Sequence, residues 1–586
     1  MTKLWTAVWQ AWPAQAWLKD YNGKTLQQDF MAAIIVTVML IPQSLAYAML
    51  AGLPPATGLY ASILPLLAYA MFGSSRTLAV GPVAVISLLS ANAVGIAYAE
   101  TGIDVITLSM ALALISGVLM LIMGIFKLGF IANLLGRPVV SGFITAAGIL
   151  IAMGQLKHLM GIPLSGHNLP ELIQGIGEYG SQTHMATLMI GVISVVFLWW
   201  ARKPLTNLLK KFVSPYAASS LAKLAPVTAV IVSILVVANF SLDAQGVAVV
   251  GAIPSGLPNL RWPELSMSLM STLLPSALMI SLIGYVESIS VAQTLANKRR
   301  QQIDPNHELL GLGAANVASA VSGGFSVTGG FSRSVVNFDA GAATPMAGVF
   351  TAVGIAIASL FLTPYLALLP KAVLGATIFV AVLTLVEPHE ISFTWKYSKQ
   401  DFAAMMITIA LVLFVSVEAG VIAGVIASIL LMLWRTSRPH HAVVGPIAGT
   451  EHFRNIKRHD VEQCDRVVAL RIDESLFFGN VRYLDNKINA IIAENEECLE
   501  HLIIMASGIN HVDFTSLETL LDFNRRLKDK GIAMHMSEVK GPVLDRLERV
   551  NFAEQLTGNI YLSQHQAWKA LALDNNACPS LSGYSA

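Results

Sequence analysis

The residues best suited to chemistry lie in a glycine-rich stretch, residues 321–337, between apolar segments long enough to cross a bilayer. Gly329 and Gly330 interrupt a helix there, and unpaired backbone groups at membrane depth are tolerated only where they are buried in protein or line a polar cavity. A helix that resumes after these glycines points its N-terminal amides into such a cavity, with a hydroxyl and a guanidinium in its first turn. The stretch therefore predicts one half of an anion-binding site, formed by Gly330, Phe331, Ser332 and Arg333.

A second break could supply the other half of this site. Gly81 and Pro82 are typical of a helix start with proline in the first turn, which leaves the backbone amides of Val83 and Ala84 pointing out of the break. A plain loop end is the alternative for this segment. On the first apolar segment, Gln43 and Tyr47 are four residues apart, so they share a helix face and could donate hydrogen bonds into the cavity or to a neighbouring helix.

Two charged residues lie inside apolar segments and therefore need an explanation. Glu287 has no cation within a helical turn, so its carboxylate could bind a proton, hold a cation among other oxygen ligands, or form a structural hydrogen bond. Arg333 could bind an anion, or form a salt bridge with Asp339 or another carboxylate. We assign Glu287 to ion coupling and Arg333 to anion binding.

The composition identifies the class of protein that must position these residues. Of the 586 residues, 55% are hydrophobic and only 12% are charged, whereas about 25% are charged in soluble domains. These values predict a polytopic membrane protein, and Lys and Arg become frequent only after about residue 436, where a soluble tail begins. The net charge of +1 and the lack of a basic stripe give no indication of nucleic-acid binding. No metal-ligand spacing, Walker loop or nucleophile elbow is present, so neither a metal, a cofactor nor an enzymatic activity is expected.

Fourteen apolar stretches are candidates for membrane segments. They are residues 30–50, 58–72, 82–99, 105–126, 139–153, 185–200 and 224–240, followed by 271–295, 309–321, 331–338, 345–362, 366–386, 402–417 and 419–434. A similar number of residues separates Pro42 from Pro82 and Glu287 from Ser332, which favours two related halves. Because each half has seven crossings, the second must be inverted, and the two breaks then face each other near the middle of the membrane.

The distribution of positive charge predicts the orientation. Most Lys and Arg residues, including Lys298, Arg299 and Arg300, fall in connections on one side, and the opposite loops hold little more than Lys157 and Arg261. We therefore expect both termini in the cytosol and a location in the cytoplasmic (inner) membrane. The predicted parts are a cytosolic or interfacial N-terminal segment (1–28, with Trp5, Trp9, Trp12 and Trp17), a transport domain (29–436), a linker (437–450), a soluble domain (451–575) and a tail (576–586).

The soluble domain shows the alternation of a small α/β fold. Strands are predicted at 467–472, 502–505 and 532–536, and helices at 514–528 and 542–550. Asp513 and Thr515 precede and open the first of these helices. They could simply cap it, or they could form a regulatory site that contacts a phosphate or nucleotide or accepts a phosphoryl group.

At these residues the chain strongly resembles the sulfate permease (SulP) family of anion transporters over almost its whole length, and the tail resembles the STAS domain of that family. The resemblance is carried by Ile41 to Ala48, Gly58-Leu59-Tyr60, Gly81-Pro82, Val286-Glu287-Ser288, and Gly329 to Ser334 with Asn337. It implies seven-plus-seven inverted repeats divided into a core and a gate domain, usually in dimers, with the core moving past the gate like a lift. It also implies an anion held between the starts of the third and tenth helices, by Val83 and Ala84, by Gly330 to Arg333, and by Gln43 and Tyr47 on the wall.

Two departures from the family pattern bear on mechanism. Sodium-coupled bicarbonate members of the family are expected to have an aspartate with a hydroxyl one turn later, whereas this chain has Glu287 and Val291. This difference favours proton symport or anion exchange. In the STAS domain, Ser516 replaces the glycine that usually follows the element containing Asp513 and Thr515, which weakens the case for phosphorylation.

The resulting hypothesis is a secondary active transporter of small inorganic or carboxylate anions, in a homodimer surrounded by lipid, with a STAS domain that could bind a cytosolic regulatory protein or a nucleotide. The sequence does not select one anion among sulfate, bicarbonate, chloride, nitrate and dicarboxylates. A site made largely of backbone amides lacks the specific side chains from which the anion could be identified. The alternatives are a sodium-coupled bicarbonate or anion symporter, a passive anion channel, a nucleobase permease and a membrane anchor for STAS signalling.

Overall fold

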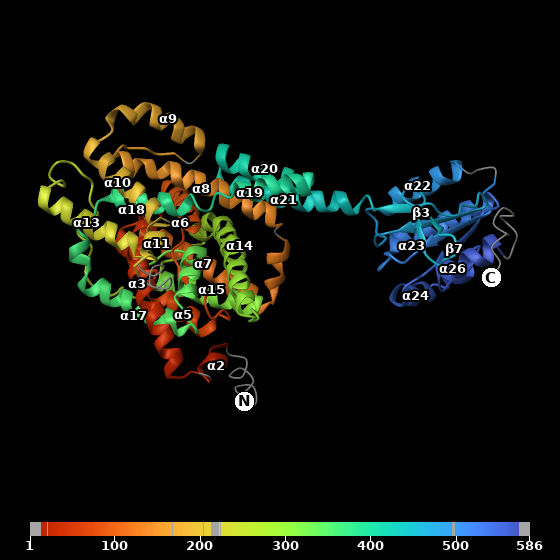
Figure 1. Cartoon of the computed structure of the whole chain (residues 1–586), viewed down its shortest axis with the longest axis horizontal. Coiled ribbons are helices and arrows are strands. Elements are labelled where there is room, and N and C mark those ends of the chain that lie inside the picture. Colours follow the sequence, from red (N-terminus) through yellow and green to blue (C-terminus); the bar gives the residue numbers. More distant parts are fainter. Residues whose placement is uncertain are drawn as a thin grey trace. The chain divides into compact units, whose positions relative to one another are not determined.

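The computed structural model describes residues 13–19, 21–134, 136–166, 168–202, 204–212, 222, 224–494 and 498–573. The chain forms two compact units, residues 1–428 and residues 429–586, which we call the membrane unit and the C-terminal unit. Both are coloured along the sequence in Figure 1. Trp5, Trp9 and Trp12 of the predicted interfacial helix and the predicted tail at 576–586 lie outside the described residues. Trp17 lies in the short helix α2 (Pro13–Leu18) and is buried.

The first half of the membrane unit consists of helices interrupted at the predicted break. Its elements are α3 (Gly23–Leu50), α4 (Pro55–Tyr60), α5 (Leu64–Phe72), β1 (Val80–Gly81), α6 (Ala84–Thr101), α7 (Val105–Ile125), η1 (Leu128–Leu134), α8 (Arg137–Met160), α9 (Leu169–Tyr179), η2 (Gly180–Gln182), α10 (Met185–Arg202), α11 (Pro204–Leu209) and α13 (Ala225–Phe240). Polar side chains cap α3 and α7, whose first amides donate to Asn22 and Asp104 respectively.

The second half repeats this pattern. Its elements are α14 (Met267–Lys298), α15 (Pro305–Val321), β2 (Thr328–Gly329), α16 (Phe331–Asp339), α17 (Met346–Phe361), η3 (Thr363–Leu366), α18 (Lys371–Val382), α19 (Pro388–Tyr397), α20 (Lys399–Phe414) and α21 (Val417–Thr436). Ser266 and Asp304 cap α14 and α15, which correspond to the helices at the start of the first half.

Each of the fourteen predicted apolar stretches coincides with a helix or a broken helix of the structure. Within the described residues, seven helical spans are long and apolar enough to cross a membrane, and four more are apolar but shorter. The prediction of a polytopic helical membrane protein is confirmed.

The packing of the two halves follows a two-fold pattern. The halves can be aligned so that α3, α5, α6, α7, α8 and α10 correspond to α14, α15, α16, α17, α18 and α20 in that order. The pair α7 and α15 then corresponds to the pair α17 and α5, and both pairs pack together. The pair α8 with α20 corresponds to α18 with α10, and α6 with α14 corresponds to α16 with α3; these pairs also pack together. Contacts that occur in such matched sets are those expected of related, inverted halves.

The helices of the membrane unit form two groups. The core group contains α3 to α7 and α14 to α17, and the gate group contains α8, α10, α13, α18 and α20. Apolar clusters lie between the groups: Val85 and Leu89 of α6 belong to one cluster with Phe143 of α8 and Met405 of α20. An apolar contact of this kind has no directional bonds that fix one group to the other.

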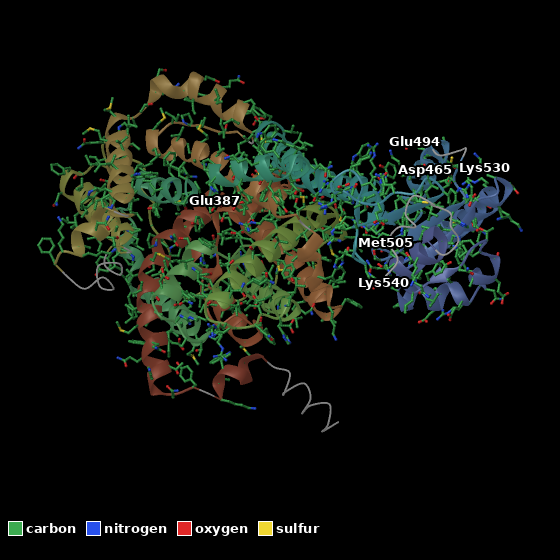
Figure 2. The ribbon with its side chains drawn as sticks, turned by 45° about the vertical axis from the view of Figure 1, so that its right-hand side comes forward. Glu387, Asp465, Glu494, Met505, Lys530 and Lys540 are labelled. Atoms are coloured by element: carbon green, nitrogen blue, oxygen red, sulfur yellow. The ribbon has the colours of Figure 1, made fainter. Side chains whose placement is uncertain are left out.

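The C-terminal unit contains a six-stranded sheet in the order β4-β3-β5-β6-β7-β8, in which β5 to β8 run parallel. Its elements are β3 (His441–Pro446), β4 (Phe453–Asn455), β5 (Val467–Ile472), α22 (Val481–Glu494), β6 (His501–Met505), α23 (Phe514–Asp529), β7 (Ala533–Ser537), α24 (Gly541–Glu548), α25 (Phe552–Gln555), β8 (Ile560–Tyr561), α26 (Gln564–Trp568) and η4 (Lys569–Leu573). Charged residues such as Asp465, Glu494, Lys530 and Lys540 lie on its surface (Figure 2).

One predicted boundary in this unit needs correction. Residues 437–450 were expected to form a linker, but His441–Pro446 form strand β3, which pairs with β4 and β5. The alternation of Ala442 and Val444, both buried, is the strand signal that Pro439 and Pro446 obscured in the sequence. The predicted α/β domain is otherwise present, with additional elements α22 and β8.

A buried histidine makes the stability of the C-terminal unit depend on pH. His535 of β7 is 3% exposed, its Nδ1 accepts the Asn559 amide at 3.0 Å, and its Nε2 lies 3.2 Å from Nδ1 of His501. Burial, and then the neighbouring His501, lower the pKa of His535 from 6.5 to about 4. The unfolded chain therefore binds a proton below pH 6.5 that the folded unit does not bind until about pH 4, so stability falls as the pH drops through this window.

Acidification from pH 7 to pH 5 should lower the unfolding free energy of the C-terminal unit by about 2 kcal/mol through His535 alone, since one pKa unit corresponds to about 1.36 kcal/mol. Urea unfolding of residues 437–573, followed by circular dichroism at several pH values, measures this change. His535→Asn keeps an acceptor for the Asn559 amide and removes the titration, so its stability should depend less on pH. Equal pH dependence in both proteins would contradict the assignment.

Candidate anion-binding site

The two predicted breaks meet in the structure. Strands β1 and β2 pair antiparallel, with Val80 opposite Gly329 and Gly81 opposite Thr328. Helix α16 begins two residues after the end of β2, and α6 begins three residues after the end of β1. Because the strands run in opposite directions, the two helices extend away from the pair in opposite directions, and their N-termini lie close together.

Among the described residues, no side chain caps either of these two helix starts. Val83 and Gly330 occupy the cap positions in extended conformations, without a side-chain hydrogen bond to the first turn. The first-turn amides therefore keep their donor capacity, unlike those of α3, α7, α14 and α15. Uncapped amides and the positive ends of two helix dipoles are suited to a negatively charged ligand.

Buried polar side chains hold the backbone of the breaks in place. The amide and carbonyl of Val327 bond to Asn316 at 2.9 and 2.8 Å, and the Gly329 amide donates to Ser288 at 2.8 Å. The Ala79 amide donates to the Ser334 hydroxyl at 3.0 Å. These bonds satisfy backbone groups that lipid could not, and they fix the geometry of the site.

Sequence reasoning assigned no role to these supporting residues, nor to Asn337, whose side-chain nitrogen donates to the Thr77 carbonyl at 3.0 Å. Asn316 is the one that the sequence could have indicated, since a carboxamide inside an apolar span needs partners. The partners of Ser334 and Asn337 lie more than 250 residues earlier in the chain.

Arg333 is buried at the junction of the two breaks. It is 2% exposed, and neither Nη1 nor Nη2 has a hydrogen-bond partner among the described residues. Its guanidinium lies against the backbone of Gly81, where an added Cβ would collide with Nη1. A buried guanidinium with unsatisfied donors is costly unless an anion or solvent completes its hydrogen bonds.

A cavity of about 270 Å³ lies beside the start of α16, between the core and gate groups. Gln43 of α3 and Ser332 of α16 line it on the core side. On the gate side it is lined by Leu198, Ala201, Thr206, Ala222, Ala225, Pro226, Thr377, Val380 and Ala381. Phe331 is half exposed at the first position of α16, and Ala84 is buried at the start of α6. Of the predicted binding residues, Gln43 and Ser332 line this cavity. The lining does not include Tyr47, Val83, Ala84, Gly330, Phe331 or Arg333, which lie at or near the paired breaks beside it.

Glu287 and Tyr47 lie within electrostatic range of Arg333 and of each other. Glu287 lines a separate cavity of about 20 Å³ between α14 and the gate helix α8, together with Val139, Phe143 and other apolar residues. Its Oε2 is buried without a hydrogen-bond partner among the described groups. The small cavity has room for about one water molecule beside this oxygen.

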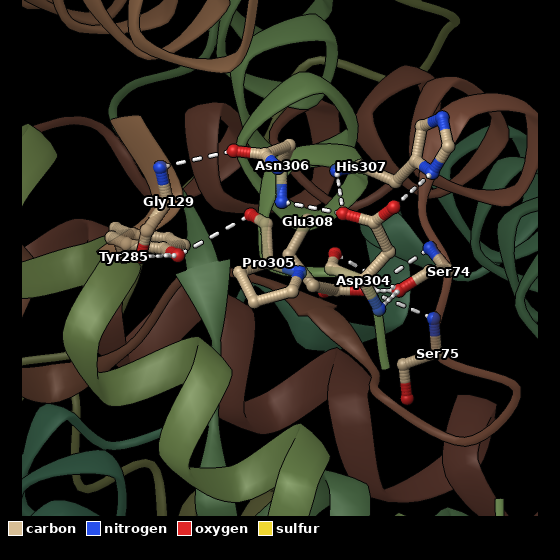
Figure 3. A network of polar contacts seen from close by, with 9 residues as sticks. All are labelled: Ser74, Ser75, Gly129, Tyr285, Asp304, Pro305, Asn306, His307 and Glu308. Atoms are coloured by element: carbon tan, nitrogen blue, oxygen red, sulfur yellow. Dashed lines mark hydrogen bonds and ion pairs between the residues drawn. The ribbon is translucent and has the colours of Figure 1, made fainter. Parts of the chain in front are cut away.

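A second buried carboxylate holds the segment that leads into β1. Glu308, in the first turn of α15, accepts hydrogen bonds from the Tyr69 hydroxyl (2.8 Å) and from the amides of Ser74 (2.9 Å) and Ser75 (2.8 Å). The Ser74 hydroxyl also donates to it at 2.7 Å (Figure 3). Four donors satisfy this carboxylate, so its role is to tie the two halves of the core group together.

The other end of α16 is held by a cation. Arg299, which directly follows α14, donates to the carbonyls of Phe338 (3.2 Å) and Ala342 (2.5 Å), and its guanidinium lies 4.4 Å from the Phe338 ring centroid. A positive charge at the C-terminal end complements the dipole of the helix whose N-terminus faces the anion site. From the sequence, Arg299 is only one of the positive charges that predict the orientation.

Arg299→Gln should raise the KM for anion uptake roughly fivefold, because a cation at a helix C-terminus contributes about 1 kcal/mol. Initial uptake rates over a range of anion concentrations in liposomes give KM and the maximal rate separately. The exposed neighbour Arg300→Gln is the matched control and should behave like the wild type. An unchanged KM in Arg299→Gln would show that this contact does not position α16.

In the C-terminal unit, Asp513 caps α23 and Thr515 is exposed in its first turn. Asp513 accepts the amides of Ser516 and Phe478, each at 2.8 Å. Burial opposes the charge of Asp513, but these two amides hold the pKa of its carboxyl below the ordinary range. The geometry supports the capping role, and a regulatory role for Asp513 and Thr515 remains a proposal.

Two broken helices that meet inside a bundle of membrane-spanning helices, followed by a separate α/β domain, define a polytopic membrane transport protein. Residues 26–408 match the model of the sulfate permease family, and residues 458–567 match that of the STAS domain. The chain therefore belongs to the sulfate permease family, and it is a transporter rather than an enzyme.

Relatives and solved structures agree with this assignment. "Sulfate transporter 4.1, chloroplastic" of Arabidopsis thaliana is 34% identical over 538 residues, which is 90% of this chain and 77% of that protein. A probable sulfate transporter of Mycobacterium tuberculosis is 30% identical over 552 residues, 93% of this chain and 95% of its own length. The murine anion transporter Slc26a9, solved in the inward-facing state, has the same fold, with a TM-score of 0.86 and 24% identity over 96% of this chain and 94% of that chain.

Proposed function

We propose that the protein is a secondary active transporter that binds its anion between the starts of α6 and α16. The observation that carries this proposal is the buried Arg333, whose Nη1 and Nη2 find no hydrogen-bond partner in the described part of the chain and lie next to two helix N-termini without a side-chain cap. In this scheme Val83, Ala84 and residues 330–333 hold the anion, and Gln43 and Tyr47 form the wall. Backbone amides and a guanidinium together favour a small oxyanion over a neutral nucleobase.

Transport then proceeds by movement of the core group against the gate group. The apolar contact between the groups and the cavity that separates α16 from α10, α13 and α18 both support this movement. Thr206 and Ala222, which line the cavity, belong to the connection that also carries Lys210 and Lys211. If that connection is cytosolic, as its positive charge favours, the structure corresponds to an inward-open state.

Glu287 is the proposed coupling residue, and a proton is the proposed coupling ion. A sodium ion needs several oxygen ligands. Among the residues that the structure describes, Glu287 is the one polar residue that lines its cavity, and Val291 stands where a hydroxyl is expected one turn later. A carboxylate with one oxygen that has no partner among the described groups, and with space for about one water, can take up and release a proton. Exchange of one anion for another, without net proton movement, would use the same anion site between the starts of α6 and α16.

Sulfate is the first anion to test, because the relatives at 30–34% identity are named as transporters or probable transporters of sulfate. The proposed setting is the cytoplasmic membrane with both termini in the cytosol, as a homodimer in which the STAS domain at 451–575 contacts a regulatory protein or a nucleotide. Because the aligned Arabidopsis relative is named as chloroplastic, fractionation of the membranes of the cell is the measurement that tests this location.

The decisive experiment is uptake of labelled sulfate, bicarbonate, chloride, nitrate and a dicarboxylate into liposomes that contain the purified protein. A proton or sodium gradient is imposed in turn. Saturable uptake that shows counterflow and responds to the proton gradient is the expected result. Flux that neither saturates nor shows counterflow would identify a passive channel, and a sodium requirement would remove the proposed coupling.

A further inference from the structure

A groove of about 260 Å³ lies between the gate helices α10 and α13, both at the margin of the membrane unit (Figure 1). Six of its nine lining residues are apolar, and the other three are serine or threonine. These residues are Ile190, Ile193, Ser194 and Phe197 of α10 and Thr228, Ala229, Val232, Ser233 and Val236 of α13. Two of the hydroxyl groups are already bonded within α13, since Ser233 donates to the Val230 carbonyl at 2.9 Å and Thr228 donates to the Leu224 carbonyl at 3.3 Å. The groove therefore offers few free polar groups to which water could hydrogen-bond.

The groove opens toward the bilayer. Ile193 is 63% exposed and Val232 is 52% exposed, although both belong to apolar membrane helices. The lining positions on α10 and α13 fall near the middle of each helix, which places the groove at the depth of the hydrocarbon core. Water has too few polar partners there, and an empty groove would lose dispersion contacts along its walls.

The groove and the anion cavity are two parts of one seam. On α10, the helical stripe that lines the groove continues one turn further to Leu198 and Ala201, which line the cavity. On α13, Ala225 and Pro226 line the cavity directly before Thr228 enters the groove. Whatever fills the groove also closes the cavity on its side facing the bilayer.

We propose that this groove binds one acyl chain of a membrane phospholipid, which seals the anion cavity against the bilayer. The groove lining runs from Ile190 to Phe197 on α10, about 10 Å at a rise of about 1.5 Å per residue, which suits an extended segment of such a chain. The exposed Lys210 and Lys211 directly follow α11 at the cavity end of the groove, and Trp199 is exposed near the end of α10. Aromatic and basic residues at one end match the interfacial position and charge of an anionic headgroup. The sealing role rests on the proposed function, whereas the binding of the acyl chain does not.

The test is to count phospholipids on the full-length protein, reconstituted in vesicles of phosphatidylcholine and phosphatidylglycerol and analysed by native mass spectrometry after extraction. Ser233→Phe fills the groove and should remove one phospholipid per chain relative to the wild type. Ser233→Ala keeps the space and should retain the lipid. Leu235→Phe adds the same ring on the lipid-facing surface of α13, outside the groove lining, and should also retain it. Ala229→Leu, a smaller filling, should give a partial loss if Ser233→Phe does not fold.

Equal lipid counts in the wild type, Ser233→Phe and Ala229→Leu would overturn the proposal. Disulfide cross-linking of Ile193→Cys between two chains in the membrane would also overturn it, because a second copy would then cover the groove. The lipid count is independent of transport, so it can succeed or fail whether or not the anion site is correct.

Discussion

Arg333→Gln is expected to lower anion uptake at low substrate concentration by roughly 10- to 100-fold. A hydrogen bond to a charged group contributes about 1.5–3 kcal/mol, and this variant removes both the charge and the bidentate geometry. The guanidinium is buried against Gly81 without a hydrogen-bond partner for either terminal nitrogen among the described residues, so an anion is the ligand that gains most from it. Initial uptake rates of labelled sulfate into liposomes, measured over a range of concentrations, give the change.

Two further variants separate binding from folding. Arg333→Lys keeps the charge but not the fork of donors, so it should retain part of the uptake. Arg261→Gln removes an exposed arginine from the connection before α14 and should leave uptake unchanged. Wild-type uptake by Arg333→Gln would remove this residue from the anion site, and the two helix starts alone would then have to account for binding.

Glu287→Gln should abolish the stimulation of uptake by an inwardly directed proton gradient. The carboxamide has nearly the same shape as the carboxyl group but cannot take up or release a proton at this position. The structure supports the choice of residue, since one oxygen of Glu287 has no described hydrogen-bond partner and faces a cavity with room for about one water between the core and gate groups. Uptake with and without the gradient measures the effect directly.

Anion counterflow without a gradient gives the matching control, because an exchange cycle does not need net proton movement. Counterflow should persist in Glu287→Gln, and Glu264→Gln, which alters an exposed carboxylate, should keep the full response to the gradient. An unchanged pH response in Glu287→Gln would exclude it from coupling. Loss of counterflow as well would assign Glu287 to binding instead.

Both predictions depend on residues that could be found in the sequence, because the membrane imposes strong local rules. Glycine and proline in an apolar segment indicate a break, and a lone charge such as Glu287 or Arg333 indicates a polar surrounding. The same rules place the membrane helices and the strands β5 to β7, whose hydrophobic pattern is local. The linker prediction at 437–450 was wrong in part because Pro439 and Pro446 obscured the local strand pattern of β3, which pairs with β4 and β5.

The sequence by itself determined the class of the protein, the positions of the two breaks and the residues that flank them, since hydrophobicity, glycine content and isolated charge are properties of short segments. Only the tertiary structure decided that Arg333 packs on Gly81, that Asn316, Ser288 and Ser334 hold the broken backbone, and that α10 and α13 part to form a groove. Apart from the bonds between Asn316 and Val327, which are 11 residues apart, these features join residues that are distant in the chain. They depend on shape and on the partners left unsatisfied after packing. No periodicity within a segment records such pairings, because packing free energy depends on which surfaces finally meet.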